Sequence, residues 1–87
     1  PVFNRFRDAR GNRASKNLYV FGYGPGATAM QLRNLFSQHA TVVDVFVKAA
    51  GFSFVNTASR EQAVLARERL SGFMLNGSCL KINFAKE

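Results

Sequence analysis

Residues 42–57 are VVDVFVKAAGFSFVNT, and this stretch contains the pattern that decides the fold. β-branched and aromatic residues fill both of its ends, and such residues favour strands. The connection between the two runs is very short, so we expect two neighbouring antiparallel strands. In the second run Phe52 and Phe54 alternate with Ser53 and Val55, which predicts that the two rings share one face of a sheet.

The flanking sequence supplies the other elements. The run NLYVFGY at 17–23 ends in a Gly/Pro loop and is typical of a strand. Residues 28–31 and 59–62 have the spacing of capping boxes, which predicts two helix starts. Asn76-Gly77 is typical of a tight turn before a last strand, at 79–84. The resulting β-α-β-β-α-β order predicts an α+β, ferredoxin-like fold, in which a four-stranded antiparallel sheet carries two helices on one face.

Period-two alternation assigns the strand residues to two faces of the sheet. We expect one set, aliphatic or small, to pack against the helices: Leu18, Val20, Val43, Val45, Val47, Ser53, Val55, Leu80, Ile82 and Phe84. The other set mixes aromatic with polar and charged residues: Tyr19, Phe21, Asp44, Phe46, Lys48, Phe52, Phe54, Lys81 and Asn83. Core packing explains rings but not rings that share a face with lysines, so we expect this second face to contact a partner.

Charge indicates what kind of partner this is. The 87 residues carry 12 Lys and Arg against 5 Asp and Glu, a net charge of +7, which favours polyanions. Residues 1–16 hold much of this excess and show no helical or strand period, so we expect a flexible basic arm before a domain at 17–87. The cations of the arm are expected to contact phosphates: Arg5, Arg7, Arg10, Arg13 and Lys16.

Composition also argues against other classes of protein. One cysteine, Cys79, excludes an internal disulfide and favours a reducing, intracellular compartment. With a single histidine, His39, the chain offers no tetrahedral metal-ligand set, and we expect no metal or cofactor. The Gly-rich segment 22–26 lacks the Lys-Ser/Thr of a P-loop and the anion-binding Arg of acylphosphatase-type enzymes. We therefore expect a binding module and not an enzyme.

Two segments resemble the signature motifs of the RNA recognition motif family. Residues 18–22, LYVFG, are similar to its RNP2 motif, and residues 51–55, GFSFV, to its RNP1 motif. The resemblance implies that Tyr19, Phe52 and Phe54 stack on bases of single-stranded RNA. It further implies RNA processing as the role and the nucleus as the location, with cytoplasm or an organelle as alternatives.

Further contacts are expected around this trio. Phe21 and Phe46 are candidates for additional stacking, with packing under the arm as the alternative for Phe21. Candidates for contacts to bases or phosphates are Lys48, Lys81, Asn83 and Lys86.

Some positions depart from the family pattern. Ala50 stands where RNP1 usually has Lys or Arg, so Lys48 or a residue of the arm would have to make that phosphate contact. Gly22 stands in place of the usual Asn of RNP2. The short connection between the central strands is similar to that in hnRNP C, the small SR splicing factors and the negative elongation factor E subunit.

Two alternatives stay open at this point. The rings could form an apolar patch for another protein or for self-association. The basic arm could instead be the main RNA binder while the sheet is blocked. In either case the candidate partners are single-stranded RNA, a protein or a second copy of the chain.

Overall fold

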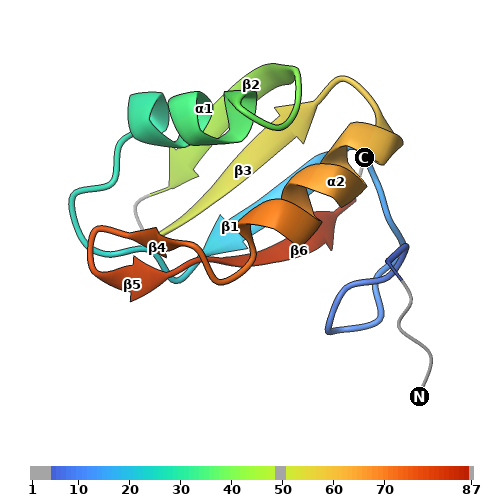
Figure 1. The fold of residues 1–87 in the computed structure, drawn as a ribbon, viewed down its shortest axis with the longest axis horizontal. Coiled ribbons are helices and arrows are strands. Elements are labelled where there is room, and N and C mark those ends of the chain that lie inside the picture. The colour runs from blue at the N-terminus through green and yellow to red at the C-terminus, as the bar shows by residue number, and fades with distance from the viewer. Residues whose placement is uncertain (1–4, 49–50, 87) are drawn as a thin grey trace.

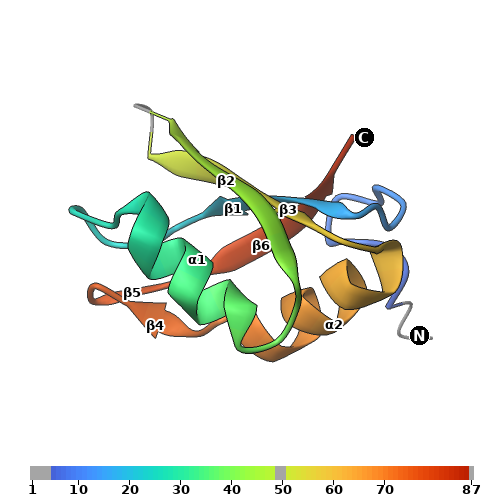
Figure 2. The same cartoon turned by 90° about the horizontal axis from the view of Figure 1, so that it is seen from above.

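The computed structural model describes residues 5–48 and 51–86. Its helices and strands are β1 (Asn17–Phe21), α1 (Ala29–Ser37), β2 (Val42–Lys48), β3 (Phe52–Thr57), α2 (Arg60–Leu70), β4 (Met74–Leu75), β5 (Ser78–Cys79) and β6 (Lys81–Ala85). The strands β2-β3-β1-β6 form one antiparallel sheet, and β4 pairs with β5 in a separate hairpin. Both helices lie on the same side of the sheet, as Figures 1 and 2 show together. The predicted α+β, ferredoxin-like architecture is confirmed.

Both helices begin at the predicted caps. At α1 the Thr28 hydroxyl accepts from the Gln31 N–H (3.1 Å) and the Gln31 side chain accepts from the Thr28 N–H (3.0 Å), which completes a capping box. At α2 only half of the box forms. The Ser59 hydroxyl accepts from the Gln62 N–H, but the Gln62 side chain accepts from Thr41 N–H and so ties α2 to the segment before β2.

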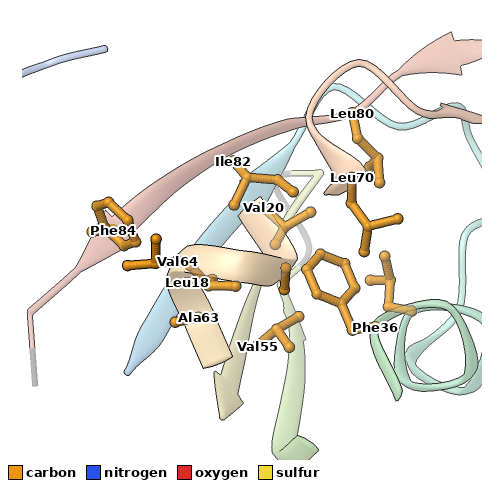
Figure 3. Packing of buried hydrophobic residues seen from close by; sticks show 12 residues of the cluster. Leu18, Val20, Phe36, Val55, Ala63, Val64, Leu70, Leu80, Ile82 and Phe84 are labelled. Carbon is orange, nitrogen blue, oxygen red and sulfur yellow. The ribbon is translucent and has the colours of Figure 1, made fainter. Parts of the chain in front are cut away.

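The core lies between the helices and the inner face of the sheet (Figure 3). Buried and half-buried residues alternate strictly along β1 and β3, as the period of two predicts. The fully buried side chains include Leu18, Val20 and Val55 from the central strands and Phe36 from α1. Burial of such side chains contributes about 1.5–3 kcal/mol each and holds the sheet in one register.

The edge strand β2 departs from the prediction. A bulge between Val42 and Asp44 leaves Val43 without a partner in the ladder and 55% exposed, whereas Val42 packs against the core. Val47 is 41% exposed. The assignment of Val43 and Val47 to the core was therefore wrong, for two different reasons. At Val43 the bulge inserts one residue and interrupts the alternation. Val47 pairs with the buried Ser53 and stays on the helix side of the sheet, but it lies near the end of an edge strand and remains exposed. Val45 is in its expected place.

The last predicted strand is also divided. Residues 79–84 do not form one strand, because Cys79 pairs with Met74 in the β4–β5 hairpin and β6 starts only at Lys81. The tight turn at Asn76-Gly77 is confirmed, since both residues have the positive φ (51° and 84°) that such a hairpin turn requires. Gly24 donates its N–H to Leu75 O, and a Cβ at Gly24 would lie 1.8 Å from Asn76 O, so only glycine fits there.

Residues 5–16, which we call the N-terminal loop, fold against the end of the sheet where β1 starts and β6 finishes (Figure 2). Asp8 is buried and its carboxylate accepts from the N–H groups of Arg10, Asn12 and Phe84 (2.9 Å each) and from the Asn12 side chain (3.0 Å). The prediction of a flexible arm did not include these contacts, and the mobility of the segment stays a prediction.

Candidate nucleic-acid interface

The face of the sheet away from the helices carries its side chains in three rows, set by the strand register. Each row crosses the strands in the order β2, β3, β1, β6. The first row, where β2 ends and β3 begins, contains Lys48, Phe52, Phe21 and Lys81. The middle row contains Phe46, Phe54, Tyr19 and Asn83, and the third row contains Asp44, Asn56, Asn17 and Ala85. No helix among residues 5–48 and 51–86 covers this face (Figure 2). The rings expected to contact a partner are thus not sealed inside the molecule.

Four rings form an aromatic cluster at the centre of this face. The centroid of Tyr19 lies 5.1 Å from that of Phe21, 5.2 Å from Phe52 and 5.7 Å from Phe54. Phe52 and Phe54 meet edge to face at 5.6 Å. Tilted and edge-to-face contacts are favourable for aromatic pairs, so the rings hold one another in place while staying half-buried. Phe21 joins the cluster, and among the described residues it does not pack under the N-terminal loop.

A groove lies beside the cluster, toward the third row. It has a volume of about 570 Å³, and its walls include Asn17, Phe46, Lys48, Phe54, Asn56 and Lys86. Phe46 is 45% exposed, and the Lys48 ammonium lies 5.9 Å from the centroid of its ring. The groove therefore combines ring faces, side-chain amides and cations, which are the groups that unpaired nucleotides contact in proteins.

The other sheet residues predicted to contact RNA lie on the same face. Lys81 is exposed and pairs with Phe21 across the ladder. Asn83 lies opposite Tyr19 but is only 8% exposed, so its amide offers little surface to a ligand. Ala50, whose departure from the family pattern removes a phosphate contact, lies outside the described residues.

The cations of the N-terminal loop do not form one group. Arg5 is paired with Glu68 of α2 (2.9 Å), and the Arg7 guanidinium donates to Gly11 O (2.8 Å). The side chains of Arg10 and Arg13 make no hydrogen bond or ion pair with the described residues. Arg13, together with Lys86, lines a hollow that adjoins the sheet groove, whereas Lys16 is exposed just before β1.

Two functional candidates, Asn17 and Asn56, were missed by the sequence interpretation. Asn17 and Asn56 are direct neighbours in the ladder and line the groove, and the Asn56 amide has no hydrogen-bond partner in the described part of the chain. Their period-two offset from Tyr19 and Phe54 was the available signal. Arg67, by contrast, has a role in the fold, since its guanidinium donates to Ile82 O (2.9 Å) and lies 5.3 Å from the centroid of the Phe84 ring.

Other chemistry finds little support in the described residues. They contain no group of three or more His, Cys, Asp or Glu side chains that could hold a metal ion, and no helix long and apolar enough to cross a membrane. The Cys79 thiol is exposed and lies 3.3 Å from the Met74 sulfur. Within the described part of the chain, the buried Nδ1 of His39 has no hydrogen-bond partner, and the ring follows α1 far from the open face.

Comparison with known proteins agrees with this geometry. The family model of the RNA recognition motif matches residues 18–81, which include all four rings of the aromatic cluster. The chain belongs to the RNA recognition motif family. Proteins of this family generally bind RNA and are not enzymes.

The relatives cover a range of eukaryotic proteins. Transformer-2 protein homolog beta of Homo sapiens is 31% identical over 98% of this chain, and the flowering time control protein FPA of Arabidopsis thaliana is 37% identical over 83%. The chain spans only 33% and 8% of these two proteins. Among solved structures, the Caenorhabditis elegans NONO-1 homodimer superposes with a TM-score of 0.76 at 25% identity, over 82% of this chain and 29% of that one. The RRM domain of Schizosaccharomyces pombe Puf1, at 24% identity and a TM-score of 0.73, covers 82% of this chain and 99% of that one, and shows the shared fold.

Proposed function

We propose that this domain binds single-stranded RNA by stacking unpaired bases on Tyr19, Phe52 and Phe54. The observation that carries the proposal is the cluster of half-buried rings on a sheet face that neither helix covers, next to Lys48 and Lys81. A ring on this surface offers its π-face to any base, and each stacked base contributes about 1–3 kcal/mol. The lysines neutralise the phosphates that connect the stacked nucleotides.

The polar row beside the rings supplies a second kind of contact. The Asn56 amide presents a donor and an acceptor to the groove in which Phe46 and Phe54 expose their rings. The Asn17 amide adds an acceptor oxygen, beside an NH2 group that donates to Lys86 O (3.4 Å). Stacking tolerates every base, whereas amide hydrogen bonds to a base edge depend on the base. We infer that Asn17 and Asn56, rather than the nearly buried Asn83, discriminate between bases.

The role in the cell is part of the same proposal. We infer that the domain acts in RNA processing in the nucleus. The relatives whose names state a ligand support RNA as the partner: RNA-binding protein 47 of Canis lupus familiaris, 39% identical over 82% of this chain and 12% of that protein, and polyadenylate-binding protein 6 of Arabidopsis thaliana, 37% identical over 86% and 15%.

Removing two rings tests the stacking proposal. In the double variant Phe52→Ala/Phe54→Ala the loss of two stacks, about 2–6 kcal/mol, should weaken the binding of single-stranded RNA at least tenfold while the domain stays folded. The matched control is Phe73→Ala, which removes a 44%-exposed ring that lies outside the sheet face. Fluorescence anisotropy with labelled RNA gives the affinity, and circular dichroism checks the fold. Unchanged affinity in a folded double variant would refute the stacking assignment.

A second candidate function is self-association or protein binding through the same face. The 45% exposure of Phe46 beside the aromatic cluster favours it, and a relative of known structure is described as a homodimer. Sedimentation of the domain with and without RNA distinguishes the two functions. A salt-insensitive dimer that does not bind RNA would support the second.

A further inference from the structure

The groove on the sheet face continues around the end of the domain. It shares Ala85 and Lys86 with a hollow that Asn12 and Arg13 also line, and this hollow shares Arg13 and Ala14 with a third one beside Arg60. We call the second and third hollows together the end groove. It runs from the open face, past the end of β6, to the start of α2, where Figure 2 shows the N-terminal loop and α2 side by side.

The end groove is basic throughout. Its charged residues are Lys86, Arg13 and Arg60, and none of its described lining residues is acidic. The side chains of Arg13 and Arg60 have no hydrogen-bond or ion-pair partner in the described part of the chain. By contrast, Arg5 is paired with Glu68, and Arg67 is committed to Ile82 O. Cations that are not engaged with the protein are available for an anion.

The walls of the end groove are held in place. Asp8 fixes the N-terminal loop to Phe84 of β6, and the Ser15 hydroxyl donates to the carbonyl oxygen of Ala85, the next residue of β6. Backbone hydrogen bonds from Ala14 N–H to Phe6 O (2.7 Å) and from Thr57 N–H to Lys16 O (2.9 Å) complete the attachment. Arg13 is therefore presented by a bonded loop, which reduces the entropy lost when it contacts a ligand.

We propose that the end groove binds the phosphates of the RNA strand after it leaves the sheet, with Arg13 and Arg60 as the contact residues. The inference rests on the proposed binding of RNA at the sheet, and it deepens it by adding a second, sequence-independent subsite. The phosphates of the RNA suit the end groove better than its bases do, because the groove has more cations than exposed rings. In addition, a guanidinium group can donate two parallel hydrogen bonds to the oxygens of one phosphate. Phe6, 54% exposed, is the one large ring that borders its far end among the described residues.

Oligonucleotide length tests this proposal. An RNA of about four nucleotides occupies the sheet alone, since the family's sheet stacks two or three bases, whereas one of about ten nucleotides also reaches the end groove. With oligouridine and oligoadenosine of both lengths, the double variant Arg13→Ala/Arg60→Ala should bind the longer RNA roughly tenfold more weakly and the shorter one with unchanged affinity. For the longer RNA, the slope of the logarithm of the binding constant against the logarithm of the salt concentration should become shallower by about 0.7 for each phosphate contact that is lost.

The matched control is Arg33→Ala/Arg69→Ala, which removes two exposed cations from the helices, neither of which lines the end groove. NMR spectra of the wild type should show shifts at Arg13, Ala14 and Arg60 with the longer RNA only. Equal losses in the two double variants would overturn the proposal in favour of diffuse charge, and so would equal affinity of the wild type for both lengths. If neither RNA shifts the signals of Tyr19, Phe52 and Phe54, the sheet proposal fails instead, and the two failures are thereby distinguished.

Discussion

The open face of the sheet and the N-terminal loop both present groups to the proposed RNA, but they are held in place by different means. The rings of the open face are positioned by strand alternation and by the core beneath them. The loop is positioned by a few polar contacts, above all those of Asp8. The comparison teaches that the aromatic cluster depends on the same core that folds the domain. It predicts that the loop, in contrast, can be released while the domain stays folded.

The largest effect is expected from the core below the rings. Leu18 is fully buried beside Tyr19 on β1, and Leu18→Ala should lower the free energy of unfolding by about 2–5 kcal/mol because it leaves a cavity. Tyr19 is the next residue and faces the open side of the sheet. Tyr19→Ala should reduce stability clearly less than Leu18→Ala does, and it should reduce the affinity for RNA more. Chemical denaturation and RNA titration of the two variants measure the contrast. Equal losses of stability would mean that the two faces of β1 are not as different as their burial indicates.

A smaller effect is expected when the loop is released. Asp8→Asn replaces an acceptor oxygen by an NH2 group, which faces N–H donors, and should lower the free energy of unfolding by about 1–3 kcal/mol. The amide proton of Phe84 should exchange faster with solvent, while that of Val55 in the core keeps most of its protection. Asp44→Asn, an exposed carboxylate on the edge strand, is the matched control. If Phe84 stayed as protected as in the wild type, the loop would not depend on this carboxylate.

The same contact has a pH dependence. Burial by itself raises the pKa of Asp8, but its hydrogen bonds, those from the Asn12 side chain and the Phe84 N–H foremost, outweigh burial and hold the pKa below its ordinary value. A carboxylate with a lowered pKa stabilises the folded state fully above the pKa of the unfolded chain, about 3.9, and loses this effect as the pH falls through its folded pKa. The stability difference between the wild type and Asp8→Asn should thus be constant at neutral pH and shrink below about pH 4. If this stability difference stayed unchanged at lower pH, the negative charge of Asp8 would not be the reason why the wild type is more stable than Asp8→Asn.

The contrast also explains what the sequence could predict. The alternation of Leu18 and Val20 with Tyr19 and Phe21 is a local property, and it correctly indicated which rings share the open face. The bulge at Val43 and the split between Cys79 and Lys81 depend on pairing with other strands, so no local period could reveal them.

The loop contacts were out of reach for the same reason. Asp8 bonds to Phe84, 76 residues further along the chain, and nothing in PVFNRFRDARGNRASK announces that partner. The formal charge of residues 1–16 was visible, but which cations are engaged was not, since Arg5 pairs with Glu68 and Arg67 with Ile82 only in the folded chain. For Asn17 and Asn56 the sequence could predict only part of the result. Alternation places both on the open face, but composition gives no reason to single them out as functional residues.

The smallest predicted effect concerns these amides and sharpens the difference between affinity and specificity. The test uses a set of RNAs that differ at one base. Because Asn56→Ala leaves the rings in place, the RNA that binds most weakly should keep its affinity. The best-bound RNA should lose about 0.5–1.5 kcal/mol, which narrows the ratio between best and worst roughly two- to tenfold. Asn34→Ala, an exposed asparagine on α1, is the matched control and should leave the ratio unchanged. Because a stacking ring lowers the affinity for every base when it is removed, a uniform loss in Asn56→Ala would show that the amide supports the platform and does not discriminate between bases.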